Sequence, residues 1–349
     1  MNIAVLIPSL DPVEPLVQLV QQLQSRGVAR IAVLDDGSGA ASQPLFAQCE
    51  ALGCMVVRHA VNRGKGAAIR TGLHALCDRF PDLDGVVTAD GDGQHAPDDI
   101  VRVARETERH PDSLILGTRD FSGRSAPLRS RFGNRFSAAF FRLSTGISCP
   151  DTQTGLRGIP AALIPFALSV AGDRYEYEMN TLFTAAQRRL PLRFVPIQTI
   201  YEDGNRTSHF RPIADSMRIY AMPLRFAAAS LGSCVLDLAL FALFARLLHV
   251  QSAQHILAAT VIARIGSGIV NFTLNRTWSF SSTRDSWTAQ GIRYLILFVC
   301  QMLASGGLTA LLSVLPLPLV LVKLLVDTSL FCVSYFIQRN WVFRPSQSQ

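Results

Sequence analysis

The chain has 349 residues, a formal net charge of +7, 49% hydrophobic residues and only 17% charged residues. That length accommodates two domains, and that composition is too apolar for an ordinary soluble protein. The seven cysteines are odd in number and never spaced C-x-x-C, which argues against a disulfide framework and a zinc site and fits a reducing compartment. No basic segment precedes the first apolar run, so we expect a strand there and no signal peptide.

Roughly the first 200 residues alternate short β-branched runs with helical patterns. In chain order these are IAVLIP, a helix over 16–23, IAVLDD, a helix over 45–52, MVVRH, a helix over 65–76 and GVVTAD. This alternation predicts an α/β fold with an open, mostly parallel, Rossmann-like sheet. Ligands of such sheets bind beyond the carboxyl ends of the strands, where Asp35, Asp36, Asp90 and Asp92 fall.

Roughly the last 125 residues are different, because four apolar segments there approach the ~20 residues that cross a bilayer. They cover residues 224–248, 256–274, 294–315 and 319–337. The links within the first pair and within the second pair carry no Lys or Arg, whereas the middle link and the tail carry several Arg residues. By the positive-inside bias, we expect the N-terminal domain, the middle loop and the C-terminus on the cytoplasmic side of the inner membrane.

We therefore expect three parts in the chain. Residues 1–213 form the α/β domain, residues 214–223 form an amphipathic juxtamembrane segment, and residues 224–345 form an all-α domain with four transmembrane helices. The net positive charge does not require nucleic acid as a partner, because the basic residues cluster at the expected membrane boundary.

The membrane part repeats itself. NFTLNRTWSF ends the second apolar segment and SYFIQRNWVF ends the fourth, so three pairs of residues are each 63 positions apart: Arg276/Arg339, Trp278/Trp341 and Phe280/Phe343. This spacing predicts two helical hairpins of one ancestry, each closed by Arg and aromatic residues at the cytoplasmic interface.

Four charged residues lie within the apolar segments, namely Asp237, Arg264, Lys323 and Asp327. Each would cost ~2.5–3.5 kcal/mol if it faced lipid at the membrane centre, so we expect them to face the bundle. Arg264 and Asp327 are also 63 positions apart, which leaves two interpretations, a structural ion pair and a site for a lipid headgroup.

The stretch VVTADGDGQHAP places two carboxylates and an amide directly after an apolar strand. It is no EF-hand loop, since position 12 counted from Asp90 is Val101 instead of Glu, and NRGKGAA lacks the Ser or Thr that a P-loop needs after its Lys. We expect Mg²⁺ or Mn²⁺ held by Asp90 or Asp92 with the side-chain oxygen of Gln94, because these cations take one or two carboxylates and complete their shell with substrate phosphates. A glycine-rich turn with solvated acids is the alternative.

Seven segments occur in a specific order, although each alone is a weak signal. They are IPSLDP, LDDGS, NRGKGAAIRTGL, TADGDGQHAPDDI, GTRDF, RFGNRF and DTQTGLRG. Together they resemble family-2 glycosyltransferases of the GT-A fold, in the branch of dolichol-phosphate mannose synthase and the polyprenyl-phosphate glycosyltransferases. The resemblance covers roughly residues 1–213, and the membrane part resembles the GtrA-like four-helix family.

The resemblance implies that the donor is a nucleotide diphosphate sugar. Its nucleotide pocket would be lined by Pro8, Ser9, Asp11 and Asp36, with Asp36 near the base or ribose. Leu10 and Pro12 depart from the family pattern, so the choice between GDP and UDP stays open.

Lys65 and Asp90 are assigned to the same nucleotide, with the metal at Asp90, Asp92 and Gln94 on the donor diphosphate. The glycines on either side of Lys65 either place backbone donors near phosphate or form a plain strand-to-helix turn.

The resemblance also implies a polyprenyl or dolichyl monophosphate as the acceptor. A phosphate ester has its second pKa near ~6 and is largely dianionic at neutral pH, so this nucleophile needs no general base. Arg119 and Arg131 match the acceptor-phosphate arginines of the family, and we assign Arg206 to the same phosphate. Asp92, Arg119 and Arg131 are the expected catalytic residues, and inversion at the sugar carbon is the expected outcome.

Three residues are expected to support the site. Asp151 and Arg157 shape its acceptor side or pair with each other within their loop, whereas Glu178 supports the site or only stabilises a helix N-terminus. The nearby segment FGNRFSAAFFRLSTG, with Phe at 132, 136 and 140, is either a core helix or a helix in the membrane interface.

These observations predict a membrane glycosyltransferase that moves a hexose, mannose or glucose, to polyprenyl phosphate on the cytoplasmic face. The alternative is a translocator of lipid-linked sugar, or an assembly partner, whose soluble domain mainly binds nucleotide sugar. A processive polysaccharide synthase is disfavoured because the chain has no Q-x-x-R-W segment. Homo-oligomerisation is left open.

Overall fold

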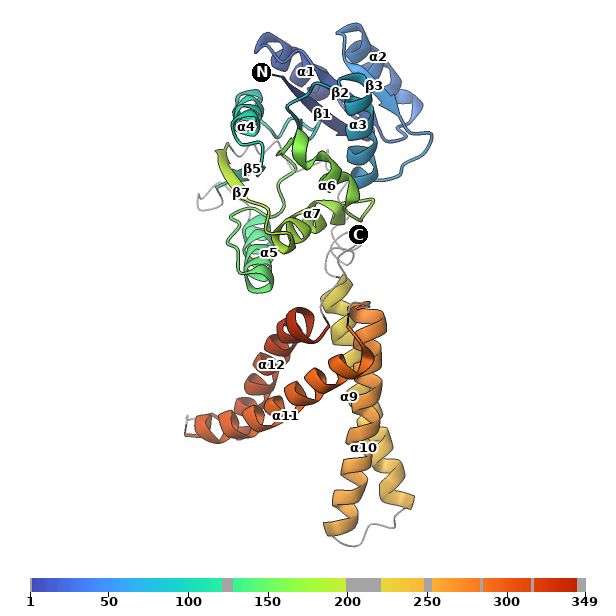
Figure 1. The fold of residues 1–349 in the computed structure, drawn as a ribbon, viewed down its shortest axis with the longest axis vertical. Coiled ribbons are helices and arrows are strands. Elements are labelled where there is room, and N and C mark those ends of the chain that lie inside the picture. Colours follow the sequence, from blue (N-terminus) through green and yellow to red (C-terminus); the bar gives the residue numbers. More distant parts are fainter. Residues whose placement is uncertain are drawn as a thin grey trace. The chain divides into compact units, whose positions relative to one another are not determined.

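The computed structural model describes residues 2–120, 128–198, 221–247, 253–282, 285–314 and 317–343. The chain divides into two compact units, Met1–Ile219 and Tyr220–Gln349 (Figure 1).

The first unit is built on a seven-stranded sheet with the order β3-β2-β1-β4-β6-β5-β7. Every pairing is parallel except those of β6, which runs antiparallel to β4 and to β5. The strands are β1 Ile3–Ser9, β2 Ile31–Asp35, β3 Met55–Arg58, β4 Gly85–Thr88, β5 Leu114–Arg119, β6 Arg157–Pro160 and β7 Leu192–Ile197. The predicted α/β fold with a mostly parallel sheet is confirmed.

Helices cover both faces of this sheet, because a strand buried on both sides needs two apolar layers. They are α1 Pro15–Ser25, α2 Gln43–Ala51, α3 Lys65–Arg79, α4 Pro97–Arg109, α5 Leu128–Thr145, α6 Ile164–Ser169 and α7 Glu176–Gln187 (Figure 1). In β1 the side chains of Ile3, Val5 and Ile7 join the core under α1, α2 and α4, and those of Ala4 and Leu6 join the core under α3, α6 and α7. This alternation follows from the two-residue period of a strand.

The register of the central strands brings the acidic segments to one edge of the sheet. Ser9 pairs with Asp35 across β1 and β2, and Leu6 pairs with Thr88 across β1 and β4. Because all three strands are parallel, Asp36 and Asp90 both follow carboxyl ends that lie side by side.

Within its described residues, the second unit contains four helices long and apolar enough to cross a membrane. They are α9 Ala221–Leu247, α10 Ala253–Leu274, α11 Trp287–Leu312 and α12 Leu319–Ile337. Helix α11 begins seven residues before the expected Tyr294, because Ser286 caps it and accepts a hydrogen bond from the amide of Ala289. Hydropathy marks only the apolar part of a helix, whereas the cap sets where its backbone starts.

The predicted repeat of two hairpins is confirmed by the geometry. Helix α10 ends in the π-helical turn η4 Asn275–Ser279 and α12 ends in η5 Gln338–Val342, at equivalent positions of the repeat. Equivalent residues also contact each other: Phe280 stacks on Phe343 with ring centroids 5.4 Å apart, and Asn275 donates to Gln338 at 3.2 Å. The cytoplasmic ends expected for the two hairpins therefore meet through residues at equivalent positions of the repeat.

The charged residues of the spans do not all face the bundle, which corrects our expectation. The side chain of Asp237 is 17% exposed, but those of Arg264, Lys323 and Asp327 are 62%, 47% and 47% exposed. Arg264 pairs with Asp237 at 3.5 Å and Lys323 pairs with Asp327 at 3.0 Å, so Arg264 and Asp327 do not pair with each other. Each of these ion pairs forms within one hairpin. Arg264 finds its partner on the neighbouring helix, and Lys323 finds its partner one turn along its own helix.

Candidate active site

The acidic segment after β4 is held by a lysine from another element. Lys65, the first residue of α3, places its Nζ 2.7 Å from Oδ1 of Asp90 and 2.8 Å from Oε1 of Glu178 on α7. The Lys65 side chain is only 16% exposed. A single buried cation therefore joins β4, α3 and α7 at the edge of the sheet where ligands bind.

The two carboxylates of this segment differ in their electrostatics. Burial alone would raise the pKa of Asp90, but the charge of Lys65 outweighs it and lowers this pKa to about 2. Burial and the negative charge of Asp90 together raise the pKa of Asp92 to about 6. Likewise, burial opposes the charge of Lys65, but Asp90 and Glu178 raise its pKa. Asp90 is thus balanced by a cation, whereas Asp92 forms no ion pair with any residue that the structure describes.

His95 lies behind this pair and was not singled out by the sequence. It is 5% exposed, and its Nδ1 accepts a hydrogen bond of 3.1 Å from the amide of Asp90. Burial lowers the pKa of His95, and this effect outweighs the negative charge of Asp90, which raises it. A neutral imidazole that accepts at Nδ1 fixes the backbone from which the Asp90 carboxylate projects.

The residues present fit a divalent metal ion. Within the described ranges no three His, Cys, Asp or Glu side chains converge on one point, so the protein alone does not complete a coordination shell. Mg²⁺ and Mn²⁺ are held by one or two carboxylates when phosphates supply the remaining ligands, which is what Asp90 and Asp92 with the amide of Gln94 offer. Burial and the charge of Asp90 disfavour the ionised form of Asp92, so a cation bound beside both carboxylates would lower the pKa of Asp92.

The expected nucleotide-pocket residues lie at the ends of β1 and β2. Asp11 is in the left-handed region with φ 42°, donates from its amide to Ser38 Oγ at 2.9 Å and accepts from the amide of Gly39 at 2.8 Å. The backbone of Ser9 accepts from the amide of Asp36, and Pro8 precedes it in β1. The structure therefore brings Pro8, Ser9, Asp11 and Asp36 together.

The carboxylate of Asp36 is engaged within the protein. It is 4% exposed and accepts hydrogen bonds from the amide of Arg63 at 2.9 Å and the amide of Gly64 at 2.7 Å. Its Oδ1 also lies 2.7 Å from Nδ1 of His59, whose Nε2 lies 3.0 Å from Oγ1 of Thr71. Because the Gly64 amide is used by Asp36, the geometry favours a plain strand-to-helix turn here, and it is the side chain of Lys65 that reaches the site.

Arg119 is oriented by Asp151. The fully buried Asp151 carboxylate accepts from Nε of Arg119 at 2.7 Å and from Nη2 at 3.2 Å, and it also accepts from the amide of Gln153 at 3.0 Å. Such a two-point contact fixes the plane of a guanidinium group. The internal Asp-Arg pair that the sequence allowed therefore exists, but its arginine is Arg119 and not Arg157.

Arg157 begins β6 and is 4% exposed. Its Nε donates to the carbonyl of Thr154 at 3.0 Å and its Nη1 donates to the carbonyl of Glu178 at 2.7 Å, whereas Nη2 has no partner in the described part of the chain. Arg157 therefore joins the TGLRG segment to α7. Glu178 is more than a favourable charge at a helix start, because its side chain binds Lys65.

Of the two remaining arginines expected to bind the acceptor phosphate, the structure describes Arg131. Arg131 lies in the first turn of α5, is partly exposed and makes no ion pair with any described residue. It is one turn from Asn134, which donates to the carbonyl of Pro150 beside Asp151 at 2.8 Å. Arg206 lies outside the described residues.

Within the same α5 segment, Phe140 packs edge to face on Phe183 of α7 with centroids 5.9 Å apart, whereas Phe136 is 52% exposed. Helix α5 therefore contributes to the core and also keeps an exposed aromatic face, so neither interpretation of this segment is sufficient alone.

Gly155 also shapes the site, and the sequence analysis did not assign it a role. A Cβ on Gly155 would lie 2.4 Å from Oδ2 of Asp90, and the carbonyl of Gly155 accepts from Thr88 Oγ1 at 2.9 Å. The carboxylate of Asp90 is therefore packed directly against the backbone of the TGLRG segment. The segment itself was visible in the sequence, but its proximity to Asp90 comes from the antiparallel pairing of β6 with β4.

An α/β domain with an acidic pair beyond β4, in a chain with four membrane-length helices, is the arrangement of a membrane-bound glycosyltransferase. Glycosyl transferase family 2 matches residues 5–162, and the family GtrA/DPMS, transmembrane domain, matches residues 225–343. The chain belongs to glycosyl transferase family 2 and carries a GtrA/DPMS transmembrane domain, as the sequence motifs predicted. It is therefore a multi-pass membrane protein.

Two of the relatives that match this chain illustrate the similarity. An uncharacterized protein of Methanocaldococcus jannaschii is 30% identical over 207 residues, which are 58% of this chain and 83% of that protein. The UDP-N-acetylglucosamine–dolichyl-phosphate N-acetylglucosaminyltransferase of Methanococcus voltae is 28% identical over 219 residues, which are 58% of this chain and 86% of that enzyme.

Two solved structures are similar at lower identity. Glucosyl-3-phosphoglycerate synthase from Mycobacterium tuberculosis, in complex with Mn²⁺, UDP and glucosyl-3-phosphoglycerate, has a TM-score of 0.45 at 18% identity and covers 64% of this chain and 77% of its own. Mannosyl-3-phosphoglycerate synthase from Rubrobacter xylanophilus has a TM-score of 0.47 at 14% identity and covers 62% of this chain and 69% of its own.

Proposed function

We propose that this protein transfers a hexose, mannose or glucose, from a nucleotide diphosphate sugar to polyprenyl or dolichyl phosphate at the cytoplasmic face of the inner membrane. The observation that carries the proposal is the group of Lys65, Asp90 and Asp92 at the carboxyl edge of the sheet. In the same domain, Asp151 fixes the guanidinium group of Arg119. The membrane domain accounts for a lipid acceptor, and the relative from Methanococcus voltae is named for transfer to dolichyl phosphate.

The donor is activated by charge at its diphosphate. Mg²⁺ or Mn²⁺ held by Asp90, Asp92 and Gln94 would stabilise the negative charge that develops on the nucleotide diphosphate. Lys65 keeps Asp90 ionised, since it holds the pKa of that carboxyl near 2. Pro8, Ser9, Asp11 and Asp36 would form the wall for the nucleotide, with Asp36 acting through the loop that it holds.

The acceptor phosphate attacks without a base. One of its oxygens forms a bond to the anomeric carbon while the bond from that carbon to the diphosphate oxygen breaks, and in-line displacement inverts the configuration. Arg119 and Arg131, with Arg206, would orient the phosphate, because guanidinium forks match phosphate oxygens. Asp151 presets Arg119 for this role through two hydrogen bonds.

An assay of sugar transfer tests the proposal and identifies the sugar. Purified full-length protein is incubated with polyprenyl phosphate and radiolabelled GDP-mannose, UDP-glucose or UDP-N-acetylglucosamine, with Mg²⁺, Mn²⁺ or EDTA. We expect a labelled glycolipid from one hexose donor that disappears with EDTA and in Asp92→Asn. Asp78→Asn, which changes an exposed carboxylate on α3, is the matched control and keeps full activity.

Each outcome has one meaning. A product from UDP-N-acetylglucosamine alone would keep the glycosyltransferase and replace the hexose by the N-acetylated sugar. Product formation that resists EDTA would remove the metal from the proposal. Retained nucleotide binding without product from any donor would overturn the catalytic proposal and favour the translocator alternative.

A further inference from the structure

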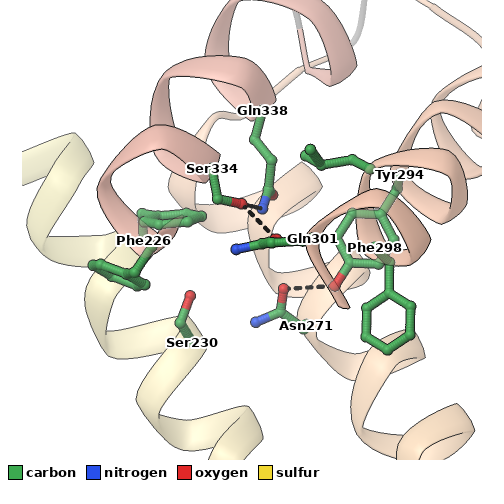
Figure 2. A pocket seen from close by; sticks show the side chains of 10 residues that line it. Phe226, Ser230, Asn271, Tyr294, Phe298, Gln301, Ser334 and Gln338 are labelled. Atoms are coloured by element: carbon green, nitrogen blue, oxygen red, sulfur yellow. Dashed lines mark hydrogen bonds between the residues drawn. The ribbon is translucent and has the colours of Figure 1, made fainter. Parts of the chain in front are cut away.

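Polar side chains form networks in both units. In the membrane unit they line a cavity of about 180 Å³ between the two helical hairpins, which Figure 2 shows. These side chains are Ser230, Asn271, Tyr294, Gln301, Ser334 and Gln338. None of them carries a charge, and their hydrogen bonds connect the membrane helices to one another, as Tyr294 does by donating to Asn271 at 2.8 Å. The network in the first unit is of another kind, because it contains a histidine and a carboxylate.

His59 is the histidine of this network, and it directly follows β3. Its side chain is only 5% exposed. Nδ1 lies 2.7 Å from Oδ1 of Asp36, and Nε2 lies 3.0 Å from Oγ1 of Thr71 on α3. A carboxylate only accepts hydrogen bonds, so it is Nδ1 that carries the proton. Both ring nitrogens are therefore engaged, and the imidazole has no nitrogen left to contact a substrate.

The carboxylate of Asp36 extends this contact to the start of α3. Its Oδ1 also accepts from the amide of Arg63 at 2.9 Å, and its Oδ2 accepts from the amide of Gly64 at 2.7 Å. Gly64 directly precedes Lys65, whose ammonium binds in the candidate active site. Hydrogen bonds therefore lead from His59 through Asp36 to the residue before Lys65.

The same backbone is closed in from its other side. Gly64 has a φ of 99°, and a Cβ on it would lie 2.5 Å from the carbonyl oxygen of Asp173 and 2.5 Å from Cγ of Arg174. The carbonyl of Asp173 also accepts from the amide of Ala67 in the first turn of α3 at 3.0 Å. The point from which Lys65 projects is thus fixed between Asp36 and the segment before α7.

The network attaches α3 at two separate points. Asp36 holds the backbone just before the helix, and Thr71 joins the helix to His59 further along. At a rise of 1.5 Å per residue, Lys65 and Thr71 are roughly 9 Å apart along the helix axis. Two attachments at this separation set the direction of the helix start as well as its place, which a single attachment would not.

We infer that His59 is a positioning residue for sugar transfer, because it fixes the ammonium of Lys65 beside Asp90 through Asp36 and the backbone of Gly64. The inference rests on the proposed function for the reaction, whereas the placement of Lys65 can be measured without a donor or an acceptor.

The amine of Lys65 reports its own placement. The chain contains only two lysines, Lys65 and Lys323, so acetylation by limiting acetic anhydride can be followed at each of them. Full-length protein in phosphatidylcholine nanodiscs is acetylated, and digestion at arginine releases the first lysine within residues 64–70 for mass spectrometry. Only a free amine is acetylated, so an ammonium held by two carboxylates reacts slowly, and Lys323 in the membrane unit serves as the internal reference.

Two substitutions separate the two contacts of His59. Asparagine places its side-chain nitrogen near the position of Nδ1 and can still donate to Asp36, whereas glutamine places its nitrogen near Nε2 and can reach only Thr71. We expect His59→Gln to speed acetylation of Lys65 about tenfold and to lower kcat/KM for sugar transfer about tenfold, since a hydrogen bond to a charged group is worth about that factor. His59→Asn loses only the neutral contact and should change each value about threefold.

Thr71→Val removes the same neutral contact from the other side and keeps the shape of the side chain. We expect it to match His59→Asn, with acetylation of Lys65 about threefold faster, so it tests the network even if His59→Gln does not fold. His74→Asn, at an exposed position of the same helix, is the matched control and should leave both rates unchanged. Slow alkylation of the buried Cys54 in the same samples shows that a variant is folded, because unfolding would expose this thiol as well.

Unchanged acetylation of Lys65 in folded His59→Gln and Thr71→Val variants would overturn the inference, and so would equal effects of glutamine and asparagine at position 59. Faster acetylation in His59→Gln together with no transfer from any sugar donor would reject the proposed function and keep the link between His59 and Lys65. Full transfer activity with unchanged acetylation in that variant would do the reverse.

Discussion

The ammonium nitrogen of Lys65 lies 2.7 Å from the carboxylate of Asp90. A second carboxylate, that of Glu178, lies 2.8 Å from the same nitrogen. This lysine is the first residue of α3. Its single positive charge therefore connects the start of α3 with the acidic segment after β4 and with the start of α7.

The first prediction concerns Lys65→Met. This change leaves two partly buried carboxylates close together without their cation, and it costs less than the about 3–5 kcal/mol of a fully buried pair because the Asp90 side chain is 29% exposed. Because Lys65 is what lowers the pKa of Asp90 against burial, that pKa rises in the variant. We expect a clearly lower melting temperature and loss of sugar transfer. Arg105→Met, which removes an exposed cation from α4, should change the stability by less than about 0.5 kcal/mol; equal melting temperatures for the two variants would contradict the role of Lys65.

The second prediction concerns Gly155→Ala. Its new Cβ would lie 2.4 Å from Oδ2 and 2.9 Å from Cγ of Asp90, so the carboxylate has to move. A displacement of this size at a catalytic group costs roughly 100-fold in rate. We expect that loss in the transfer assay, together with a higher Mg²⁺ requirement. Gly133→Ala, at a helical position with nothing within 4 Å of the added carbon, is the control and should stay active; comparable activity of both variants would argue against close packing at Asp90.

The third prediction concerns pH and three buried thiols. Burial raises the pKa of Cys49 to about 11, of Cys54 to about 12 and of Cys149 to about 11, from an ordinary value of 9.0. The folded state therefore binds these protons more tightly than the unfolded state. Their contribution to stability is fully present below pH 9 and is lost as the pH rises through 11 to 12.

Alkylation with iodoacetamide tests whether these thiols are protonated and buried in the folded chain. At pH 8 only about one thiol in a thousand is ionised at a pKa of about 11, so these three cysteines should react slowly in the native chain and fast after unfolding in guanidinium. Peptide mapping separates them from the other four cysteines. Rapid modification of Cys54 in folded protein at pH 8 would refute the prediction.

The fourth prediction concerns the ion pair between α9 and α10. Asp237 lies 3.5 Å from Arg264 and also accepts from Ser267 at 2.8 Å. Asp237→Leu leaves Arg264 without a counter-charge among apolar helices, at a cost of up to about 3 kcal/mol. We expect a lower yield and melting temperature of the full-length protein in detergent, and recovery in the double variant Asp237→Leu/Arg264→Leu. If the single and double variants melt alike, the pair does not stabilise the hairpin.

The sequence predicted the fold well because its patterns are local. Periods of two and of 3.6 residues mark the strands and helices of the first unit, and four apolar runs mark the membrane helices. The 63-residue offset predicted the two hairpins, and their matching π-turns and the stacked Phe280 and Phe343 confirm it. Helix α11 starts before the apolar segment that the sequence marked, because its cap, Ser286, lies in a polar segment that hydropathy ignores.

The site was predicted only in part. Asp36, Asp90 and Asp92 follow strands that the sequence located, so their common edge could be foreseen. Their partners could not be foreseen, because Lys65 meets Glu178 from 113 positions away and Arg119 meets Asp151 from 32 positions away. The sequence offered Arg157 for Asp151 because the two are close in the chain, and the fold chose Arg119 instead.

The sequence by itself determined the class of the protein, since composition, strand order and motif order depend on residues that are neighbours along the chain. Only the tertiary structure decided which charges neutralise each other, that Gly155 packs on Asp90, and that six uncharged polar side chains from two hairpins enclose a cavity. Electrostatic pairing and packing fall off over a few ångströms, so they depend on distances in space that no pattern along the chain specifies.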